Sequence, residues 1–491
     1  MSSAVATEIK TIDNFIQGQY KAPKKGEYFE DIDPATGKAI AKVANGGAED
    51  IDEAAAAAKL AFEQGPWPRM SMQERCAILR KVGDLILKNL ETLAIAETVD
   101  TGKPISESRE GDIPRSAQNF HFFSDYAQAL NDDSYSVNAN ERHLAIREPL
   151  GVAGLITPWN LPLYLATWKI APCLAMGNSC ILKPAEWTPH TANLLGALMQ
   201  EAGVPEGVFN VVNGFGAKSA GEALTTHPDV RCISFTGETS TGRAIMGAAA
   251  STLKKLSFEL GGKGANIIFE DADLQEAIPT AIRAAYRNQG EICLAGSRLF
   301  VQESIYNKVR DELLERVKQI RVGNPLDEKT QMGAIISKEQ LQKVQSYIEI
   351  GKNDGKLLFG GERLTTLGEG NYLSPALISE IDNKSRVCQE EIFGPVLPLI
   401  PFKAEEELVE MVNSTPYGLS CSVWTNDANR QHRVSRDIKS GIVWINCWFA
   451  RDLRTPFGGQ KSSGVGREGG RWALEFFSEM KTICFRYKSG Q

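Results

Sequence analysis

Short apolar runs alternate with stretches of helical periodicity between Gly151 and Gly261. Five of these runs have the length and composition of buried strands: GVAGLIT from Gly151, SCILK from Ser179, VFNVV from Val208, VRCISF from Val230 and KLSFEL from Lys255. Strands that are apolar along their whole length are covered on both faces of a sheet. The pattern therefore predicts an α/β fold with a doubly wound parallel sheet, a class that binds nucleotides at the carboxyl ends of its strands.

The stretches between these runs predict the covering helices. We expect helices over 163–176 and 217–227, and another from about Ser240. Thr188 is expected to cap a further helix that has Pro189 at its first position and Gly203 just past its end. Helices over 49–62 and 72–90 are expected to pack on the same domain.

A second α/β region follows at Asp273, where apolar residues recur on one helical face. Asp273 and Glu276 have the spacing of a capping box. Pro279 is expected to kink this helix, and Gly290 to end it. Further helices are predicted over 304–320 and 340–353, and a strand over 441–445.

Two polar, alternating segments, 134–147 and 481–487, have the pattern of projecting strands. Such strands pair either with another chain or within their own subunit, and the pattern favours neither.

The composition of the chain argues against several classes of protein. The 491 residues include 54 Lys and Arg against 61 Asp and Glu, a formal net charge of −7, which gives no general attraction to nucleic acid. The nine cysteines form no CxxC pair, which favours reduced thiols in a cytoplasmic protein. The first residues have no apolar segment of the kind that marks a signal peptide. The five histidines show no ligand spacing, so we predict no metal.

A glycine-containing turn, FTGETSTG, follows the fourth strand at Phe235. Gly237 and the amides of the next helix would suit a phosphate. The alternative, which is more common for such a pattern, is a turn before a helix that binds no phosphate. Lys183 and Glu186 follow the second strand, where they would hydrogen-bond a ribose; a carboxylate there favours NAD over NADP. The alternative is a solvated ion pair.

Three side chains are candidates for catalysis. Cys293 follows the predicted helix among glycines, where a thiol is accessible to a substrate, although most free cysteines are buried hydrophobes. Glu259 ends the fifth strand and is either a general base or a surface charge. Asn160 follows the first strand and either donates its amide to an oxyanion or shapes a turn.

Seven motifs occur in one order along the chain: TPWN, KPAE, FTGETSTG, FELGGK, GEICLAGSR, EEIFGPV and PFGGQKSSGVGREGG. Together they resemble the NAD-dependent aldehyde dehydrogenase family over nearly the whole chain. The resemblance implies an NAD-binding domain (1–133 and 148–262), an α/β catalytic domain (263–461) and a β oligomerisation arm (134–147 and 478–491). It also implies NAD as cofactor, a homodimer or homotetramer, and neither a nucleic-acid nor a membrane partner.

The resemblance assigns roles to individual residues. Cys293 is similar to the family's nucleophile, Glu259 to its general base and Asn160 to its oxyanion amide. The expected cofactor-binding residues are Ile156, Thr157, Pro158, Trp159, Lys183, Glu186, Gly216, Phe235, Thr236, Gly237, Glu238, Thr241, Leu260, Glu391 and Phe393. Two residues depart from the common pattern: Glu238 replaces a serine, and Glu291 replaces a glutamine.

The implied reaction is oxidation of an aldehyde to an acid. Cys293 attacks the aldehyde, hydride leaves to the nicotinamide, and Glu259 activates the water that hydrolyses the thioester. The intact set Asn160, Glu259 and Cys293 argues against a non-catalytic structural relative, and Glu259 argues against a coenzyme A-acylating enzyme.

The substrate is expected to be a carboxylated semialdehyde. DIPRSAQNF and INCWFARDLRTPFGG resemble the 2-aminomuconic and 2-hydroxymuconic semialdehyde dehydrogenases of aromatic catabolism. Arg115 and Arg451 would hold the distal carboxylate, and Leu165 and Trp168 would line the aldehyde tunnel or belong to the core. Alternatives are pairing of Arg115 with Asp112 and of Arg451 or Arg454 with Asp452. Other substrates left open are 5-carboxymethyl-2-hydroxymuconic semialdehyde, betaine aldehyde and retinal.

Overall fold

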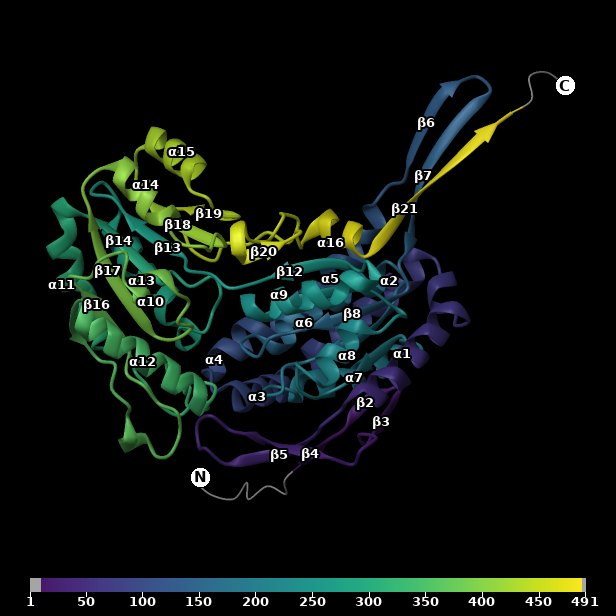
Figure 1. The fold of residues 1–491 in the computed structure, drawn as a ribbon, viewed down its shortest axis with the longest axis horizontal. Coiled ribbons are helices and arrows are strands. Elements are labelled where there is room, and N and C mark those ends of the chain that lie inside the picture. Colours follow the sequence, from purple (N-terminus) through teal and green to yellow (C-terminus); the bar gives the residue numbers. More distant parts are fainter. Residues whose placement is uncertain (1–9, 488–491) are drawn as a thin grey trace.

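The computed structural model describes residues 10–487 as two α/β units and a projecting β arm (Figure 1). The predicted α/β fold is confirmed. The proposed boundaries at residue 1 and residue 491 lie outside the described residues. No helix in the described part of the chain is both long enough and apolar enough to cross a bilayer.

The first unit is built on an eight-stranded sheet in the order β20-β12-β11-β8-β9-β10-β2-β3. Its five central strands are parallel, as predicted: β8 Val152–Ile156, β9 Ser179–Lys183, β10 Phe209–Val211, β11 Val230–Thr236 and β12 Lys255–Glu259. Antiparallel edge strands complete it: β2 Asn14–Ile16, β3 Gln19–Lys21 and β20 Gly464–Val465. The central strands are buried except for one exposed residue in β11 and two half-buried residues at the start of β12, because helices cover both faces.

Two apolar cores lie on the two faces of this sheet. On one face pack α1 Ala48–Glu63, α8 Ala220–Thr226 and α9 Thr239–Ala249. On the other pack α2 Met72–Lys88, α5 Ile113–Tyr126, α6 Pro162–Ala175 and α7 His190–Ala202. Helix α3, Leu90–Thr101, lies against α7, and β1 Lys10–Ile12, β5 Ala39–Ala44 and β4 Tyr28–Ile32 form a small separate sheet.

Helix α7 begins one residue later than predicted. Pro189 is its capping residue rather than its first helical residue, and the buried Thr188 hydroxyl has no hydrogen-bond partner among the described residues. Gly203 ends the helix in a left-handed conformation, as predicted.

The second unit contains a seven-stranded sheet in the order β15-β16-β17-β14-β13-β18-β19. All pairs are parallel except that between β15 and β16. The strands are β13 Ala265–Ile268, β14 Arg298–Gln302, β15 Lys356–Phe359, β16 Ala376–Ser379, β17 Val396–Phe402, β18 Ser420–Trp424 and β19 Ile442–Ile445. The chain passes from the first sheet to the second between β12 and β13, which is where the proposed domain boundary lies.

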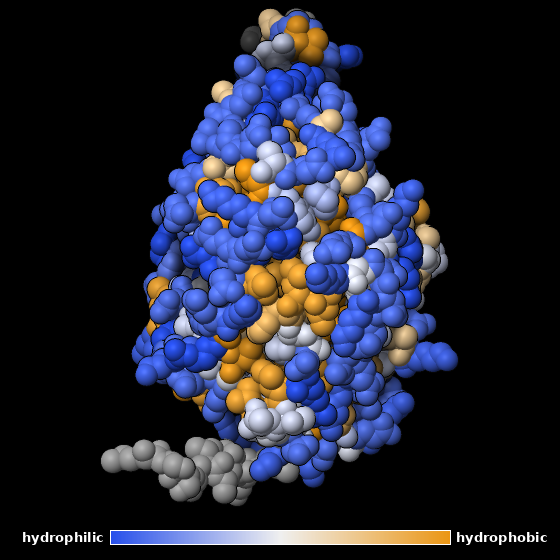
Figure 2. Space-filling view, turned by 90° about the vertical axis from the view of Figure 1, so that its left-hand side faces the viewer, coloured by the Kyte–Doolittle hydropathy of each residue, from blue (hydrophilic) through white to orange (hydrophobic). Residues whose placement is uncertain are grey.

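Helices cover this sheet on both faces as well. One core contains α10 Leu274–Tyr286 and α11 Tyr306–Val317; the other contains α12 Lys338–Asp354, α13 Arg386–Gln389, α14 Glu405–Asn413 and α15 Ala428–Asp437. Seen from the side of α11, the surface is mostly hydrophilic with an apolar area near its middle (Figure 2).

Helix α10 differs from its prediction at its carboxyl end. Asp273 caps it through the amide of Gln275, and the helix runs through Pro279 without a break. It ends at Tyr286 rather than Gly290, because Asn288 and Gln289 take left-handed conformations (φ 49° and 55°). This reversal starts the loop that leads to Cys293.

The arm is a three-stranded antiparallel sheet in the order β21-β7-β6 (Figure 1). Its strands are β6 Asp133–Asn138, β7 Glu141–Pro149 and β21 Ser478–Arg486, which follows α16 Gly470–Phe476. β21 pairs with β7 from Ser478 opposite Pro149 to Arg486 opposite Glu141. The two predicted segments therefore pair within one chain. Residues 488–491 of the proposed arm lie outside the described residues.

Candidate active site

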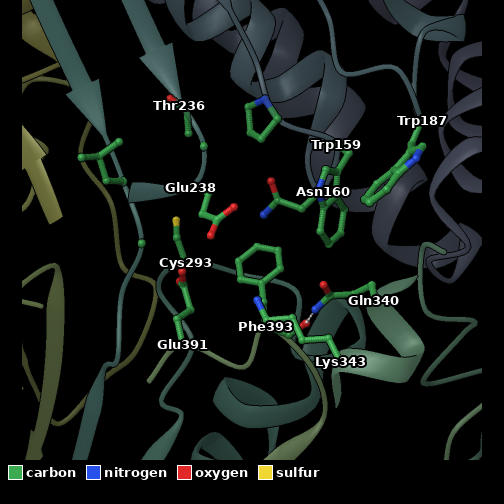
Figure 3. A pocket seen from close by; sticks show the side chains of 14 residues that line it. Trp159, Asn160, Trp187, Thr236, Glu238, Cys293, Gln340, Lys343, Glu391 and Phe393 are labelled. Carbon is green, nitrogen blue, oxygen red and sulfur yellow. Dashed lines mark hydrogen bonds between the residues drawn. The ribbon is translucent and has the colours of Figure 1, made fainter. Parts of the chain in front are cut away.

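A cleft between the two units is lined by Cys293 (Figure 3). Cys293 as a residue is partly exposed, and it packs against an apolar cluster that includes Ile292 and Leu294. Burial raises the pKa of the Cys293 thiol to about 12, with Glu391 and Glu259 adding to the rise and Arg451 opposing it. The thiol is therefore protonated near neutral pH, and its reaction as a nucleophile requires removal of that proton.

Asn160 lines the same cleft, in the turn between β8 and α6 (Figure 3). Its Nδ2 donates to the main-chain oxygen of Glu291 at 2.8 Å. Its own main-chain oxygen accepts from Lys103 Nζ at 2.8 Å and from Asn288 Nδ2 at 3.1 Å. An amide nitrogen has two hydrogens, so one remains for a second acceptor such as a substrate oxygen.

Glu259 is the last residue of β12 and does not line this cleft. Its side chain is buried, and both carboxylate oxygens lack a hydrogen-bond partner among the described residues. Burial raises the pKa of Glu259 well above its usual range; Glu468 adds to the rise, whereas Lys169 opposes it. Lys169 donates to Glu468 at 2.6 Å, which leaves Glu259 as the unpaired acid.

A glycine leaves room for this carboxylate. A Cβ at Gly458, whose φ is +152°, would lie 2.8 Å from Glu259 Oε1, so a larger residue there would displace the acid. An unpaired buried carboxyl group destabilises a fold, and such groups concentrate at functional sites.

The structure places the fifteen expected cofactor residues in four groups. Eight of them line the cleft: Pro158, Trp159, Thr236, Gly237, Glu238, Leu260, Glu391 and Phe393. Lys183 and Glu186 lie after β9, joined by an Nζ–Oε2 distance of 3.1 Å. Ile156, Thr157 and Phe235 are buried in or beside their strands, whereas Gly216 and Thr241 are exposed away from the cleft lining.

The cleft lies at an edge of the first sheet that suits a nucleotide. It opens at the carboxyl ends of β8, β11 and β12, the position at which doubly wound sheets bind nucleotides. Helix α9 begins beside Gly237 and Glu238 with its free amides. Glu391 accepts from the amide of Gly262 at 2.7 Å, and burial raises its pKa to about 7.

Sequence reasoning missed part of this lining. Trp187, Gly261, Gln340 and Lys343 also line the cleft, and Trp159 packs against both Trp187 and Phe393. Gln340 donates to the main-chain oxygen of Phe393 at 2.6 Å and so fixes a residue with a positive φ of 58°. Trp187 directly follows KPAE and Gly261 lies within FELGGK, so both were detectable from the motifs. The helix that carries Gln340 and Lys343 was predicted, but its sequence did not indicate that these two residues line a cleft.

Two arginines predicted to bind substrate converge on one tyrosine of α6. The guanidinium of Arg115 lies 5.7 Å from the centre of the Tyr164 ring and that of Arg451 lies 5.9 Å from it. Arg451 also donates to the Tyr164 hydroxyl at 2.6 Å and stacks on Trp168 and Phe457. Trp168 belongs to the buried core, and Leu165 to a small apolar cluster with Leu161 and Tyr164.

Neither arginine forms an ion pair within the described residues. Arg115 donates from Nη1 to Gln118, while its Nε and Nη2 are buried without a partner there. Asp112 does not pair with Arg115, the alternative considered above; it binds Lys103 at 2.6 Å. Arg454 does pair with Asp452, also at 2.6 Å.

Lys103 is a site residue that the sequence did not reveal. Its ammonium is fully buried and contacts Asp112, Glu97 at 3.7 Å and the main-chain oxygen of Asn160. Burial alone would lower the pKa of Lys103, but Asp112 and Glu97 outweigh it and hold that pKa above its usual range. Lys103 therefore ties the turn of Asn160 to the helical segment that carries Arg115.

One further cluster lies outside the cleft. Within the described residues, Asp31, Asp100 and His190 have candidate ligand atoms within 4.8 Å of one another, and His190 Nδ1 lies 3.0 Å from Asp100. That no metal is bound stays a prediction.

Comparison with known proteins identifies relatives over nearly the whole chain. Residues 20–483 match the aldehyde dehydrogenase family. A 2-hydroxymuconic semialdehyde dehydrogenase of Pseudomonas sp. (strain CF600) is 44% identical over 486 residues, 97% of this chain and 100% of the relative. A 2-aminomuconic semialdehyde dehydrogenase of Mus musculus is 45% identical over 98% of this chain and 99% of the relative. The NAD⁺ complex of an aldehyde dehydrogenase from Bacillus cereus has a TM-score of 0.95 at 39% identity, covering 98% of this chain and 97% of that one.

Proposed function

The chain belongs to the aldehyde dehydrogenase family, and from this premise we propose that it oxidises a carboxylated semialdehyde to the corresponding acid with NAD. The muconic semialdehydes named for its relatives are the expected substrates. The observation that carries this substrate class is the convergence of Arg115 and Arg451 on Tyr164 without an acidic partner in an ion pair. Two guanidinium groups held in this way match one carboxylate.

The chemistry that NAD supplies when bound is acceptance of a hydride. Lys183 and Glu186 would hold the adenosine ribose, the start of α9 would hold the pyrophosphate, and Glu391 and Phe393 would lie at the nicotinamide ribose. The Glu186 carboxylate would repel a phosphate on that ribose, which supports NAD over NADP.

Cys293 forms the covalent bond to the substrate. Its sulfur attacks the aldehyde carbon after losing its proton, and the carbonyl oxygen becomes an oxyanion. The free hydrogen of Asn160 Nδ2 and the main-chain N–H of Cys293 are the donors proposed to stabilise that oxyanion. Loss of one such donor typically lowers kcat by about 10²–10³-fold.

Glu259 acts in the second half of the reaction. Its raised pKa makes its ionised form a stronger base than an exposed glutamate, so it can take a proton from the water that hydrolyses the thioester. Lys169 and Glu468, which hydrogen-bond each other beside it, set the charge that surrounds this base.

The arm is proposed to join subunits into a homo-oligomer. Tyr135, Val137, Met480 and Tyr487 expose between 52% and 59% of their surface on it, a concentration of apolar area suited to an interface. Light scattering of the whole chain and of a Val137→Asp variant tests this, since the variant is expected to shift toward the monomer. All nine cysteines are free thiols, which supports a reducing cytoplasm.

A substrate panel tests the proposed class. We expect kcat/KM for 2-hydroxymuconic semialdehyde to exceed that for propanal, and Arg115→Gln to lower it by at least about tenfold through loss of a charged hydrogen bond. Arg454→Gln is the matched control, because that guanidinium is occupied by Asp452. Preference of the wild type for propanal, or an unchanged kcat/KM for the semialdehyde in Arg115→Gln, would exclude the carboxylated class.

A further inference from the structure

A cavity of about 650 Å³ lies between the two units, beside the loop that leads to Cys293. The first unit contributes Glu107, Glu110 and Gly111, from the π-helical turn Ser108–Asp112 and the residue before it. Helix α10 of the second unit contributes Arg283, and the turn that follows it contributes Arg287. A cavity of this volume accommodates a small organic molecule, and π-helical turns are frequent at functional sites.

Arg287 is fixed in this cavity on two sides. Its Nε donates to Glu107 Oε2 at 3.2 Å, and its guanidinium carbon lies 5.4 Å from the centre of the Phe449 ring. Its Nη1 and Nη2 donate no hydrogen bond within the described residues. A Cβ at Gly111 would lie 3.1 Å from Nη2, so the glycine leaves room for the guanidinium at this position. A guanidinium held at Nε and on one face presents the fork that binds a carboxylate.

Arg287 lies beside the segments that carry the expected substrate-binding arginines. Gly111 precedes Arg115 by four residues in a continuous helical segment, which places them about one turn apart on one side. Phe449 belongs to the apolar cluster that contacts Cys293, and Arg451 follows it by two residues. Arg287 therefore lies next to both segments that carry the arginines proposed to bind the substrate carboxylate.

The charges of this region favour a substrate with two carboxylates. Arg283 and Arg287 line the cavity together with Glu107 and Glu110, and Arg115 and Arg451 add two guanidinium groups at Tyr164, outside the cavity lining. Glu107 is engaged by Arg287 and by the amide of Asn288 at 3.2 Å, and Glu110 is exposed at the rim. Two carboxylates of a bound substrate would balance the remaining positive charge.

We propose that the free edge of Arg287 binds a second carboxylate of the substrate, so that the enzyme prefers a dicarboxylated semialdehyde to a monocarboxylated one. This inference rests on the proposed function, because it assumes that Arg115 and Arg451 hold the first carboxylate. It identifies Arg287 as a specificity-determining residue.

The test compares two substrates that differ by one carboxylate arm: 2-hydroxymuconic semialdehyde and 5-carboxymethyl-2-hydroxymuconic semialdehyde. The wild type is expected to have the higher kcat/KM with the dicarboxylated substrate. Arg287→Gln is expected to lower kcat/KM for the dicarboxylated substrate by about tenfold, mainly by raising KM. Its kcat/KM for the monocarboxylated substrate is expected to fall by less than about threefold. The ratio of the two values cancels any general damage to the catalytic loop or to folding.

Arg109→Gln is the matched control, because Arg109 lies between Glu107 and Glu110 in sequence but binds Glu91 at 2.8 Å and Glu328 at 2.6 Å. Its ratio is expected to equal that of the wild type. An equal loss for both substrates in Arg287→Gln, or a wild type that does not prefer the dicarboxylated substrate, would overturn the inference and leave the proposed function standing. A wild type that prefers propanal to both would overturn the two together.

Discussion

Lys103 donates from its buried ammonium to the main-chain oxygen of Asn160 at 2.8 Å. The same ammonium binds Asp112 at 2.6 Å, three residues before Arg115. One buried cation thus connects the proposed oxyanion donor with the segment of the proposed substrate-binding arginine.

Replacement of Lys103 by methionine should affect both stability and turnover. It leaves the carboxylates of Asp112 and Glu97 buried without their cation, which typically costs about 3–5 kcal/mol of unfolding free energy. Urea unfolding measures this cost, and we expect kcat of the folded fraction to fall more than KM for NAD changes. Lys88→Met is the control, since Lys88 is exposed and lies 3.7 Å from Glu201; unchanged stability and kcat in Lys103→Met would contradict the assigned role.

The reactivity of Cys293 should respond to Glu391 in a pH-dependent way. Above its pKa of about 7, Glu391 is ionised, and its charge helps to raise the pKa of the Cys293 thiol to about 12. Glu391→Gln removes that charge, lowers the pKa of the thiol and increases the thiolate fraction. We therefore expect alkylation of Cys293 by iodoacetamide to be several-fold faster than in the wild type at pH 8.5.

The difference should disappear at pH 6, where Glu391 of the wild type is already protonated. Glu390→Gln serves as the control, because Glu390 pairs with Arg386 at 2.9 Å and does not line the cleft. Acceleration of the same size at both pH values would show that Glu391→Gln acts by opening the cleft rather than by its charge.

Cofactor choice should depend on Glu186. Glu186 lies 3.1 Å from Lys183 Nζ, where the adenosine ribose is proposed to bind. The negative charge of its carboxylate would repel a phosphate on that ribose. Glu186→Ser is expected to raise kcat/KM for NADP by about tenfold or more and to raise KM for NAD. Steady-state kinetics with both cofactors measure this, with the exposed Glu201→Ser as control; an unchanged NADP value would place the ribose elsewhere.

The sequence predicted what depends on local patterns. Continuous apolar runs identified the parallel strands, and Gly203 marked the end of α7. The end of α10 was predicted four residues too late, because the left-handed Asn288 depends on Glu107, whose carboxylate accepts its amide from the other unit. That contact spans 181 residues and leaves no periodic signal.

The candidate site was predictable to a similar degree. Cys293 and Asn160 stand in recognisable motifs, and the structure brings both to one cleft. Lys103 and Arg287 stand in none of the seven motifs, and their roles follow from burial and from partners far along the chain. A single charged residue in a sequence does not show which of its neighbours it will contact.

The central claim is that the substrate becomes covalently bound to Cys293 and is released by hydrolysis through Glu259. The most direct measurement is the intact mass of Glu259→Gln after mixing with NAD and 2-hydroxymuconic semialdehyde. The account predicts one acyl group per chain, located on Cys293 by peptide mapping, together with a burst of one NADH per site and no adduct in Cys293→Ala. Absence of both adduct and burst, or wild-type turnover by Cys293→Ala, would contradict it.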